Sequence, residues 1–324
     1  MSRVAQRCVA AGLAVSLVAF AVGCGGGGGP STKAGKQATI TVGLIPIVDD
    51  APLFLGIKKG FFKQEKLNVK TQFAAGGAVI LPSVLRGDFD FGFSNNVSLF
   101  IAQSKHLPIK IVSQGNLAGK QGFGQLLVRK GGPIKSVKDL QGGKTVAVNT
   151  LNNICDVTIR ATLEKKGVNV SGMKFQEIEF PDMLAPLKAG RIDAACEVEP
   201  FVTLGAQQGL VPIDSFYTDF SPDLSVATYF TTDREISQNK DVVNRFIRAM
   251  NKSLNYAGTH SAEVRQIIPT YTKIPPAAAK VIKLPAWNSS LNRSALAALG
   301  QATAKYGHIP SPPNLNDLIY TPSG

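Results

Sequence analysis

The chain of 324 residues is long enough for about two domains, and 44% of its residues are hydrophobic, which supports a large buried core. Its charged fraction of 18% and its 32 glycines are ordinary for a soluble globular protein, apart from one local run of glycines. The net charge of +13 comes without a basic stripe interleaved with aromatic residues, which argues against a nucleic-acid partner, and the export signal described next excludes the compartment of nucleic acids. A solvated basic surface with mild attraction for anionic solutes or the anionic membrane face is favoured.

The N-terminus reads as an export signal. Arg3 and Arg7 form a positive start, and the uncharged run at 9–22 that follows is too short to span a bilayer. The run ends in Ala-Val-Gly-Cys at 21–24, which resembles a bacterial lipobox; a plain secretory signal with a coincidental Cys24 is the alternative. Residues 25–29 are all glycine and would behave as a flexible tether. We therefore predict a signal peptide at 1–23, a tether at 24–38, and an extracytoplasmic protein held on a bacterial cell membrane by a lipid on Cys24.

Strand-like and helix-like segments alternate from residue 39 onward. Apolar runs predict strands at 39–45, 69–74, 89–94, 109–114, 125–129, 145–149, 175–179, 192–196 and 225–231. Helices are predicted at 51–62, 78–86, 97–105, 152–166, 182–189 and 199–208. This alternation is typical of an α/β fold with mainly parallel sheets flanked by helices. Two similar helix–Gly–strand units, at 82–91 and 186–194, favour two lobes of like construction.

From residue 239 onward the pattern is helical only. Helices are predicted at 241–257, 262–268, 276–282, 294–306 and 315–320, and the first of these has a clear apolar stripe. We expect this C-terminal part to form a peripheral helical tail packed against one lobe.

Two cysteines, Cys155 and Cys196, remain outside the signal and the lipobox. In the oxidising space outside the cytoplasm they can pair as a disulfide. Two small buried apolar side chains are the alternative.

No catalytic motif is complete. The Gly-Gly-Lys-Thr at 142–145 leads into a strand, whereas a phosphate-binding loop leads into a helix. The Ser-x-x-Lys at 237–240 lacks its companion motifs. The three histidines lie at no metal-ligand spacing. We therefore predict a binding protein rather than an enzyme, with no metal and no cofactor.

The segment at 50–69 resembles a known family. Its order of Ala-Pro, apolar helix, Lys-Gly-Phe-Phe, Lys-Gln-Glu and Leu-Asn-Val is similar to the opening of the nitrate/alkanesulfonate/taurine-type solute-binding proteins, a group that includes thiamine-precursor binders. Further matches are Gly-Gly at 76–77, the segment at 85–92, and Val-Glu-Pro-Phe at 198–201. The resemblance covers nearly all of the chain after the predicted signal.

The resemblance implies a two-lobed, type II periplasmic-binding-protein-like fold that closes on its ligand, with the helical tail on lobe one. Lobe one would comprise 39–125 and 227–324, lobe two 126–226, and the crossing strands would be 125–129 and 226–230. The implied function is that of a monomer that captures a small organic solute (a sulfonate, an aromatic carboxylate or a pyrimidine-like molecule) and delivers it to the permease subunits of an ABC importer. An enzyme on the same fold, acting on a small cofactor precursor, is the alternative, with Cys155 or Cys196 as its only nucleophile candidates.

Ligands of open α/β sheets lie beyond the carboxyl ends of the strands, where helix N-termini present free N–H groups. The strand-to-helix junctions therefore predict these ligand contacts: Asp49, Asp50, Gly77, Ala78, Asn95, Asn96, Gln114, Asn149, Thr150, Asn152, Asp182 and Glu197. Each polar residue among them is equally explained as a helix cap, so only their convergence predicts a site. No Lys or Arg lies at these junctions, whereas carboxylates do, and they could bind a neutral heteroaromatic or a cationic, pyrimidine-like ligand through hydrogen bonds. An anion held by helix N-termini stays open. The junctions favour an aromatic or heteroaromatic solute, with Phe123 and Phe180 as stacking partners.

Overall fold

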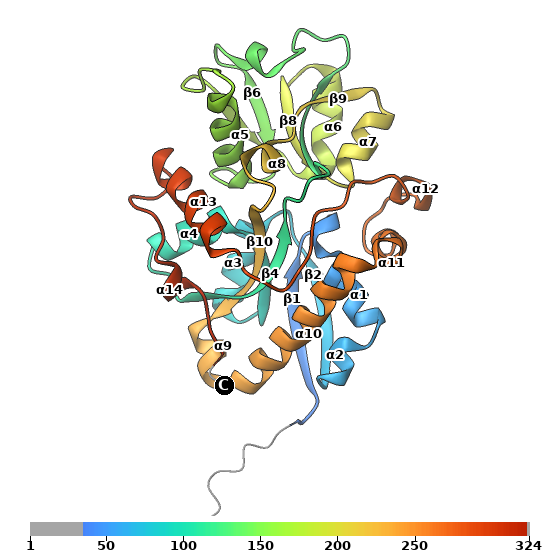
Figure 1. The fold of residues 1–324 in the computed structure, drawn as a ribbon, viewed down its shortest axis with the longest axis vertical. Coiled ribbons are helices and arrows are strands. Elements are labelled where there is room, and N and C mark those ends of the chain that lie inside the picture. The colour runs from blue at the N-terminus through green and yellow to red at the C-terminus, as the bar shows by residue number, and fades with distance from the viewer. Residues whose placement is uncertain (1–34, 323–324) are drawn as a thin grey trace, which may run out of the picture. The chain divides into compact units, whose positions relative to one another are not determined.

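Two five-stranded sheets organise residues 35–322, the part of the chain that this computed structural model describes (Figure 1). The predicted signal peptide, the lipidation site at Cys24 and most of the tether lie outside the described residues. The first sheet has the order β2-β1-β3-β10-β4, with β1 (Ala38–Leu44), β2 (Leu67–Phe73), β3 (Phe91–Asn95), β4 (Ile109–Leu117) and β10 (Ser225–Thr232). The second has the order β7-β6-β8-β5-β9, with β5 (Gly124–Arg129), β6 (Thr145–Val148), β7 (Lys174–Glu177), β8 (Ala194–Val198) and β9 (Leu210–Asp214).

In each sheet four strands run in one direction and one strand runs against them. β10 is antiparallel to β3 and β4, and β5 is antiparallel to β8 and β9, whereas the remaining pairs are parallel. The reversed strands β5 and β10 follow the segments 118–123 and 215–224, in which the chain passes from one sheet to the other. The two segments are hydrogen-bonded to each other, because the Ala118 N–H donates to the Leu224 carbonyl at 2.9 Å. A chain that leaves one sheet at its carboxyl edge enters the other at the same edge, so the next strand must run backwards. Each predicted crossing strand, 125–129 and 226–230, thus lies in one sheet, just after the true crossing.

Helices cover both sheets and complete two lobes. The first lobe has α1 (Ala51–Lys58), α2 (Phe61–Gln64), α3 (Gly77–Arg86), α4 (Asn96–Ser104), α9 (Asp233–Gln238), α10 (Lys240–Thr259), α11 (Ser261–Ile267), α12 (Pro276–Ala279), α13 (Arg293–Lys305) and α14 (Leu315–Leu318). The second lobe has α5 (Ile154–Lys165), α6 (Phe180–Ala189), α7 (Phe201–Gln207) and α8 (Phe216–Phe220). The α/β, two-lobed prediction is confirmed.

Three local predictions needed correction. The predicted helix at 51–62 is two helices, because Gly60 adopts φ 74°, a left-handed conformation that ends α1. Strand β9 was not predicted because its Pro212 argues against a strand in the sequence. The structure tolerates this proline because β9 is the edge strand of its sheet. Helices α8 and α9 were missed because they are too short to show a helical period.

The apolar stripe of α10 forms the core of the first lobe, as its sequence predicted. Phe246 stacks on Phe91 of β3, with ring centroids 3.9 Å apart, and contacts Tyr229 of β10 at 5.8 Å. Every residue of β10 is buried, although in strand order it lies one place from the centre of the first sheet, between β3 and the edge strand β4.

The C-terminal tail contacts both lobes. Helix α10 packs on α1 and α2 of the first lobe, as expected, whereas α13 contacts both α4 and α5 (Figure 1). Glu164 of α5 accepts hydrogen bonds from Lys305 Nζ (2.5 Å) and from Tyr306 Oη (2.8 Å). The prediction of a tail on lobe one alone is therefore incomplete, because the periodicity of a helix does not show which elements cover its two sides.

Cys155 and Cys196 form a disulfide that joins the start of α5 to β8. The pairing that the sequence left open is thus decided, and neither sulfur is a free thiol.

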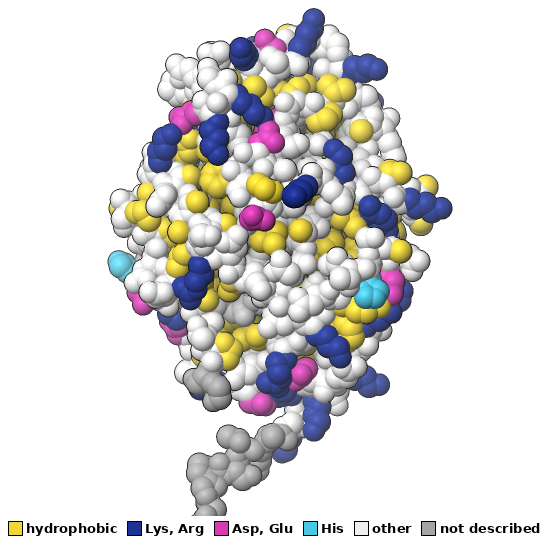
Figure 2. Space-filling model, in the orientation of Figure 1, with side chains coloured by type: hydrophobic (Ala, Val, Ile, Leu, Met, Phe, Trp, Pro, Cys, Tyr) yellow, Lys and Arg dark blue, Asp and Glu magenta, His cyan; other side chains and the backbone are white. Residues whose placement is uncertain are grey.

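The surface of residues 35–322 gives two further observations. No helix in this part of the chain is long and apolar enough to cross a membrane. On the face drawn in Figure 2, Lys and Arg side chains are spread over both lobes and do not gather in one stripe.

Candidate ligand-binding site

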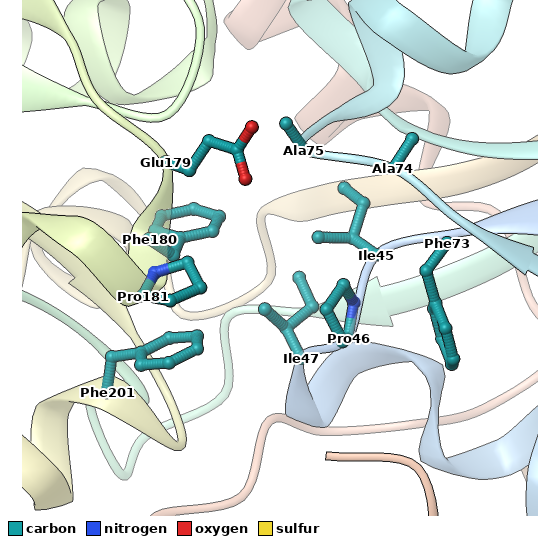
Figure 3. A pocket seen from close by; sticks show the side chains of 10 residues that line it. All are labelled: Ile45, Pro46, Ile47, Phe73, Ala74, Ala75, Glu179, Phe180, Pro181 and Phe201. Carbon is teal, nitrogen blue, oxygen red and sulfur yellow. The ribbon is translucent and has the colours of Figure 1, made fainter. Parts of the chain in front are cut away.

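A cavity of about 320 Å³, which we call the outer chamber, lies between the two lobes. Its lining residues come from the ends of β1 and β2 on one side and from the starts of α6 and α7 on the other: Ile45, Pro46, Ile47, Phe73, Ala74, Ala75, Glu179, Phe180, Pro181 and Phe201. Figure 3 shows these two groups facing each other across a gap, with the Glu179 carboxylate directed toward Ala75. Phe180 and Phe201 lie nearly parallel, with ring centroids 6.3 Å apart. The chamber is therefore mainly apolar and aromatic.

A smaller cavity of about 30 Å³, the inner pocket, shares Ile45, Ile47 and Phe180 with the outer chamber. Its other lining residues are more polar and come from both lobes: Asp49, Phe93, Asn95, Asn149, Ile154, Val198, Tyr217, Val226 and Ala227. A space of this size holds one or two waters, or a single small group of a larger ligand.

Asp49 is the charged residue of the inner pocket. It lies in the 3-10 turn Val48–Asp50 that leads into α1, and it is 3% exposed. Its Oδ2 atom has no hydrogen-bond partner among the described residues. Burial raises the pKa of Asp49 to about 7. Its own backbone N–H and the Asn116 side chain offset part of this rise in pKa, and a donor from a ligand to Oδ2 would offset more of the cost of burial.

Asp50, the next residue, is bonded within the protein. Its Oδ1 accepts a hydrogen bond from Tyr229 Oη, and its Oδ2 accepts one from the backbone N–H of Ile45, both at 3.0 Å. Burial raises its pKa well above the ordinary range as well. Asp50 therefore joins α1 to β1 and β10 and does not face the cavity.

Of the predicted contact residues, Asp49, Asn95 and Asn149 come together in the inner pocket. Asn149 also links the lobes, because its Nδ2 donates to the carbonyl oxygen of Ala75 at 3.3 Å. The convergence that the sequence suggested is therefore present for these three residues.

Several other predicted residues bond within a lobe. Asn96 donates to the Ser225 carbonyl (2.8 Å), and Gln114 accepts from the Ser225 hydroxyl (3.0 Å). Thr150 accepts from Asn153 Nδ2 at 3.2 Å. Gly77 allows α3 to approach β3, because a Cβ atom there would lie 2.0 Å from Ser94 Oγ.

The last four predicted residues lie elsewhere. Ala78 and Asn152 line a separate cavity of about 430 Å³, which His308 also lines. Asp182 is exposed on the first turn of α6. Glu197 is fully buried in β8, and neither carboxylate oxygen has a hydrogen-bond partner within residues 35–322. None of these four lines the outer chamber or the inner pocket.

Sequence reasoning missed most of the aromatic lining. Phe201 follows the Val-Glu-Pro at 198–200 and belongs to the segment that resembles the family, but the sequence did not predict it as a ligand contact. Tyr217 lies in α8, a helix that was not predicted. Of the two predicted stacking partners, Phe180 lines both cavities, whereas Phe123 is buried against Tyr217 (centroids 5.5 Å apart) and lines neither.

Comparison with known proteins identifies the family of this chain. A family model described as NMT1/THI5 like matches residues 48–264, from the turn that holds Asp49 through both sheets. The chain belongs to the NMT1/THI5-like family. Among curated relatives of this NMT1/THI5-like protein, YtlA of Bacillus subtilis (strain 168), named as a candidate binding protein, is 21% identical over 215 residues. That match covers 66% of this chain and 64% of YtlA, so less than two thirds of the relative's length is spanned.

Solved structures share the fold of this NMT1/THI5-like protein. The ligand-binding component of an ABC-type import system from Staphylococcus aureus superposes with a TM-score of 0.77 at 18% identity, covering 88% of this chain and 97% of that one. The alkanesulfonate-binding protein SsuA from Xanthomonas axonopodis pv. citri, bound to MOPS, gives a TM-score of 0.74 at 16% identity, covering 89% and 99%. At these identities the likeness establishes the two-lobed α/β fold.

Proposed function

We propose that this NMT1/THI5-like protein is the solute-binding lipoprotein of an ABC importer. It captures a small organic solute between its lobes and delivers the solute to the permease subunits. The observation that carries the proposal is the outer chamber with its inner pocket, lined from both lobes at the carboxyl ends of their strands. The lobes would follow the expected division into 39–125 with 227–324, and 126–226, with each boundary moved back to the crossing segments 118–123 and 215–224.

The relatives support this function. SsuA is named for alkanesulfonate binding, the Staphylococcus protein as a component of an import system, and YtlA as a candidate binding protein. Because each shares under a quarter of its residues with this chain, the solute itself is argued from the cavity and not from them.

The lining side chains favour binding over catalysis. Among the described residues that line the two cavities there is no Ser, Thr, Cys, Lys or His. The nucleophiles of the alternative enzyme hypothesis, Cys155 and Cys196, are joined in a disulfide. An enzyme would need a nucleophile or a base close to its substrate, and the carboxyls of Asp49 and Glu179 are the remaining candidates for a base, so the screen below also measures conversion of each solute.

The location and the anchor rest on the N-terminal segment. The positive start, the apolar run and the Ala-Val-Gly-Cys at 21–24 support export and lipidation at Cys24. A lipid-anchored monomer on the outer face of the cell membrane is then tethered beside the permease that it supplies.

A thermal-shift screen of the chain from residue 25 onward tests the function. It includes sulfonates, nitrate, aromatic carboxylates, pyrimidines and amines, with NMR analysis of each solute after incubation. We expect one class to stabilise the fold by about 2.7 kcal/mol at one hundred times its dissociation constant, without conversion. Phe180→Ala should weaken that binding, whereas Phe220→Ala, in a cavity on α5 and α13, should not. Conversion of a solute into product would contradict the proposal.

A further inference from the structure

The outer chamber and the inner pocket contain carboxylates and no cation. Among the described residues that line them there is no Lys or Arg, whereas Asp49 lies on the first lobe and Glu179 on the second. Glu199 is nearby, since its carbonyl accepts from the Val48 N–H at 3.0 Å, but its carboxylate is already bonded to Thr203 and to the Lys283 N–H. The protein therefore offers a ligand negative charge from both sides of the cleft.

Asp49 is the group that requires a ligand. It is 3% exposed, it lines the inner pocket, and its Oδ2 atom accepts no hydrogen bond from any residue in 35–322. Asn116 lies near this carboxyl, and its side-chain amide also has no partner of good hydrogen-bond geometry in the described chain. Leaving a buried carboxyl unpaired costs free energy, which a bound N–H donor would recover.

The N-terminus of α1, which begins directly after the turn that holds Asp49, does not make the site prefer an anion. An anionic ligand at a helix N-terminus would be attracted by the free N–H groups of the first turn. Here the side chain of Asp49 already lies at the turn before α1 and lines the inner pocket, so an anion bound there would meet a carboxyl group.

Aromatic side chains line the outer chamber, which adjoins the inner pocket of Asp49 at Phe180. Phe180 lines both cavities, Phe201 lies parallel to it, and Phe73 lines the opposite wall. Aromatic faces attract cations and pack on flat apolar groups. The outer chamber of about 320 Å³ accommodates one aromatic ring with a short substituent, while the inner pocket admits only a small group.

We propose that the solute is a cation: a flat apolar body in the outer chamber that carries a positively charged nitrogen, whose N–H groups donate to Asp49 in the inner pocket. This inference rests on the proposed solute-binding function and adds the charge and shape of the solute. The alkanesulfonates for which SsuA is named carry the opposite charge.

Three probes of one shape and different charge test the proposal: benzamidine (positive), benzamide (neutral) and benzoate (negative). Isothermal titration calorimetry on the chain from residue 25 onward at about pH 8.5 should give the affinity order benzamidine, benzamide, benzoate. Asp49→Asn should weaken benzamidine binding at least about tenfold. Asp88→Asn removes the same charge from an exposed loop of the first lobe and should leave binding unchanged.

Acidification gives a second readout. Because burial raises the pKa of Asp49 to about 7, its carboxyl is protonated at about pH 5.5 while benzamidine stays positively charged. Benzamidine binding should therefore weaken about tenfold between pH 8.5 and pH 5.5 in the wild-type chain, and much less in Asp49→Asn.

Three results would overturn the proposal: benzoate binding more tightly than benzamidine, equal benzamidine affinity in Asp49→Asn and Asp88→Asn, or no benzamidine binding at 20 mM. Benzoate binding that is lost in Phe180→Ala would reject the cationic solute but keep the solute-binding function. Conversion of a probe into product would reject the function itself.

Discussion

At the scale of residues, Asp49 and Asp50 show how two adjacent carboxyls acquire different roles. Both are buried in one turn, yet Asp50 accepts hydrogen bonds from Tyr229 and from the Ile45 N–H, whereas Asp49 Oδ2 has no partner among the residues described. Their sequence context is the same strand-to-helix junction, so both were predicted as contacts. Only the positions of β1 and β10 separate the structural carboxyl from the one that faces the cavity.

The substitution Asp49→Asn should stabilise the unliganded protein at alkaline pH. Burial raises the pKa of Asp49 from its ordinary value of 3.8 to about 7, so the folded chain binds this proton more tightly than the unfolded chain does. The free energy of unfolding therefore falls as pH rises from about 4 to 7 and stays low above that range. Urea unfolding should show Asp49→Asn to be more stable than wild type by about 2–4 kcal/mol at pH 8.5, and equal to it at pH 4. Equal stabilities at pH 8.5 would show that the buried carboxyl carries no such cost.

At the scale of elements, the disulfide joins two segments that the sequence predicted separately. Cys155 lies in the first turn of α5 and Cys196 in β8, 41 residues apart. Cys155 Sγ also lies 3.8 Å from the Tyr217 hydroxyl, and Tyr217 lines the inner pocket. The bond therefore stabilises the wall of the second lobe that faces the ligand.

Removing this disulfide should destabilise the protein by about 2–4 kcal/mol, because the unfolded chain gains the entropy of an open loop. Denaturant unfolding of Cys155→Ala/Cys196→Ala, compared with wild type with and without a reductant, measures the effect. Reduced wild type should approach the stability of the double variant, and the double variant should not respond to the reductant. A wild-type unfolding midpoint that reduction leaves unchanged would contradict this role.

At the scale of the whole molecule, three of the connections between the described lobes involve whole segments of the chain. Two are the crossing segments 118–123 and 215–224, which bond to each other. The third is the tail, in which Lys305 and Tyr306 bond to Glu164 of α5. If the proposed receptor closes on its solute by a hinge motion, we expect the crossing segments to bend and the contacts of the tail with α5 to repack.

The predicted export signal and lipobox imply that the chain is held on the outer face of the cell membrane by a lipid on Cys24. In a bacterial host the wild-type protein should fractionate with the membrane and incorporate labelled palmitate, and Cys24→Ser should lose both properties. Cys8→Ser is the matched control, because Cys8 lies within the predicted signal and should not be lipidated. Labelling of Cys24→Ser at the wild-type level would reject the anchor.

The sequence by itself determined the alternation of strands and helices, the glycine that ends α3, and the polar residues at the strand-to-helix junctions. The spacing of apolar residues and the backbone conformation of a glycine depend on residues that are close in the chain, so a local pattern shows them. Within the described chain, β9, α8 and α9 escaped this reasoning because a proline or a short length removes the period. Only the tertiary structure decided that Cys155 pairs with Cys196, that α13 contacts both lobes, and that Asp49 rather than Asp50 faces the cavity. These outcomes depend on contacts between residues far apart in the chain, and no local pattern encodes which side chains will find a partner there.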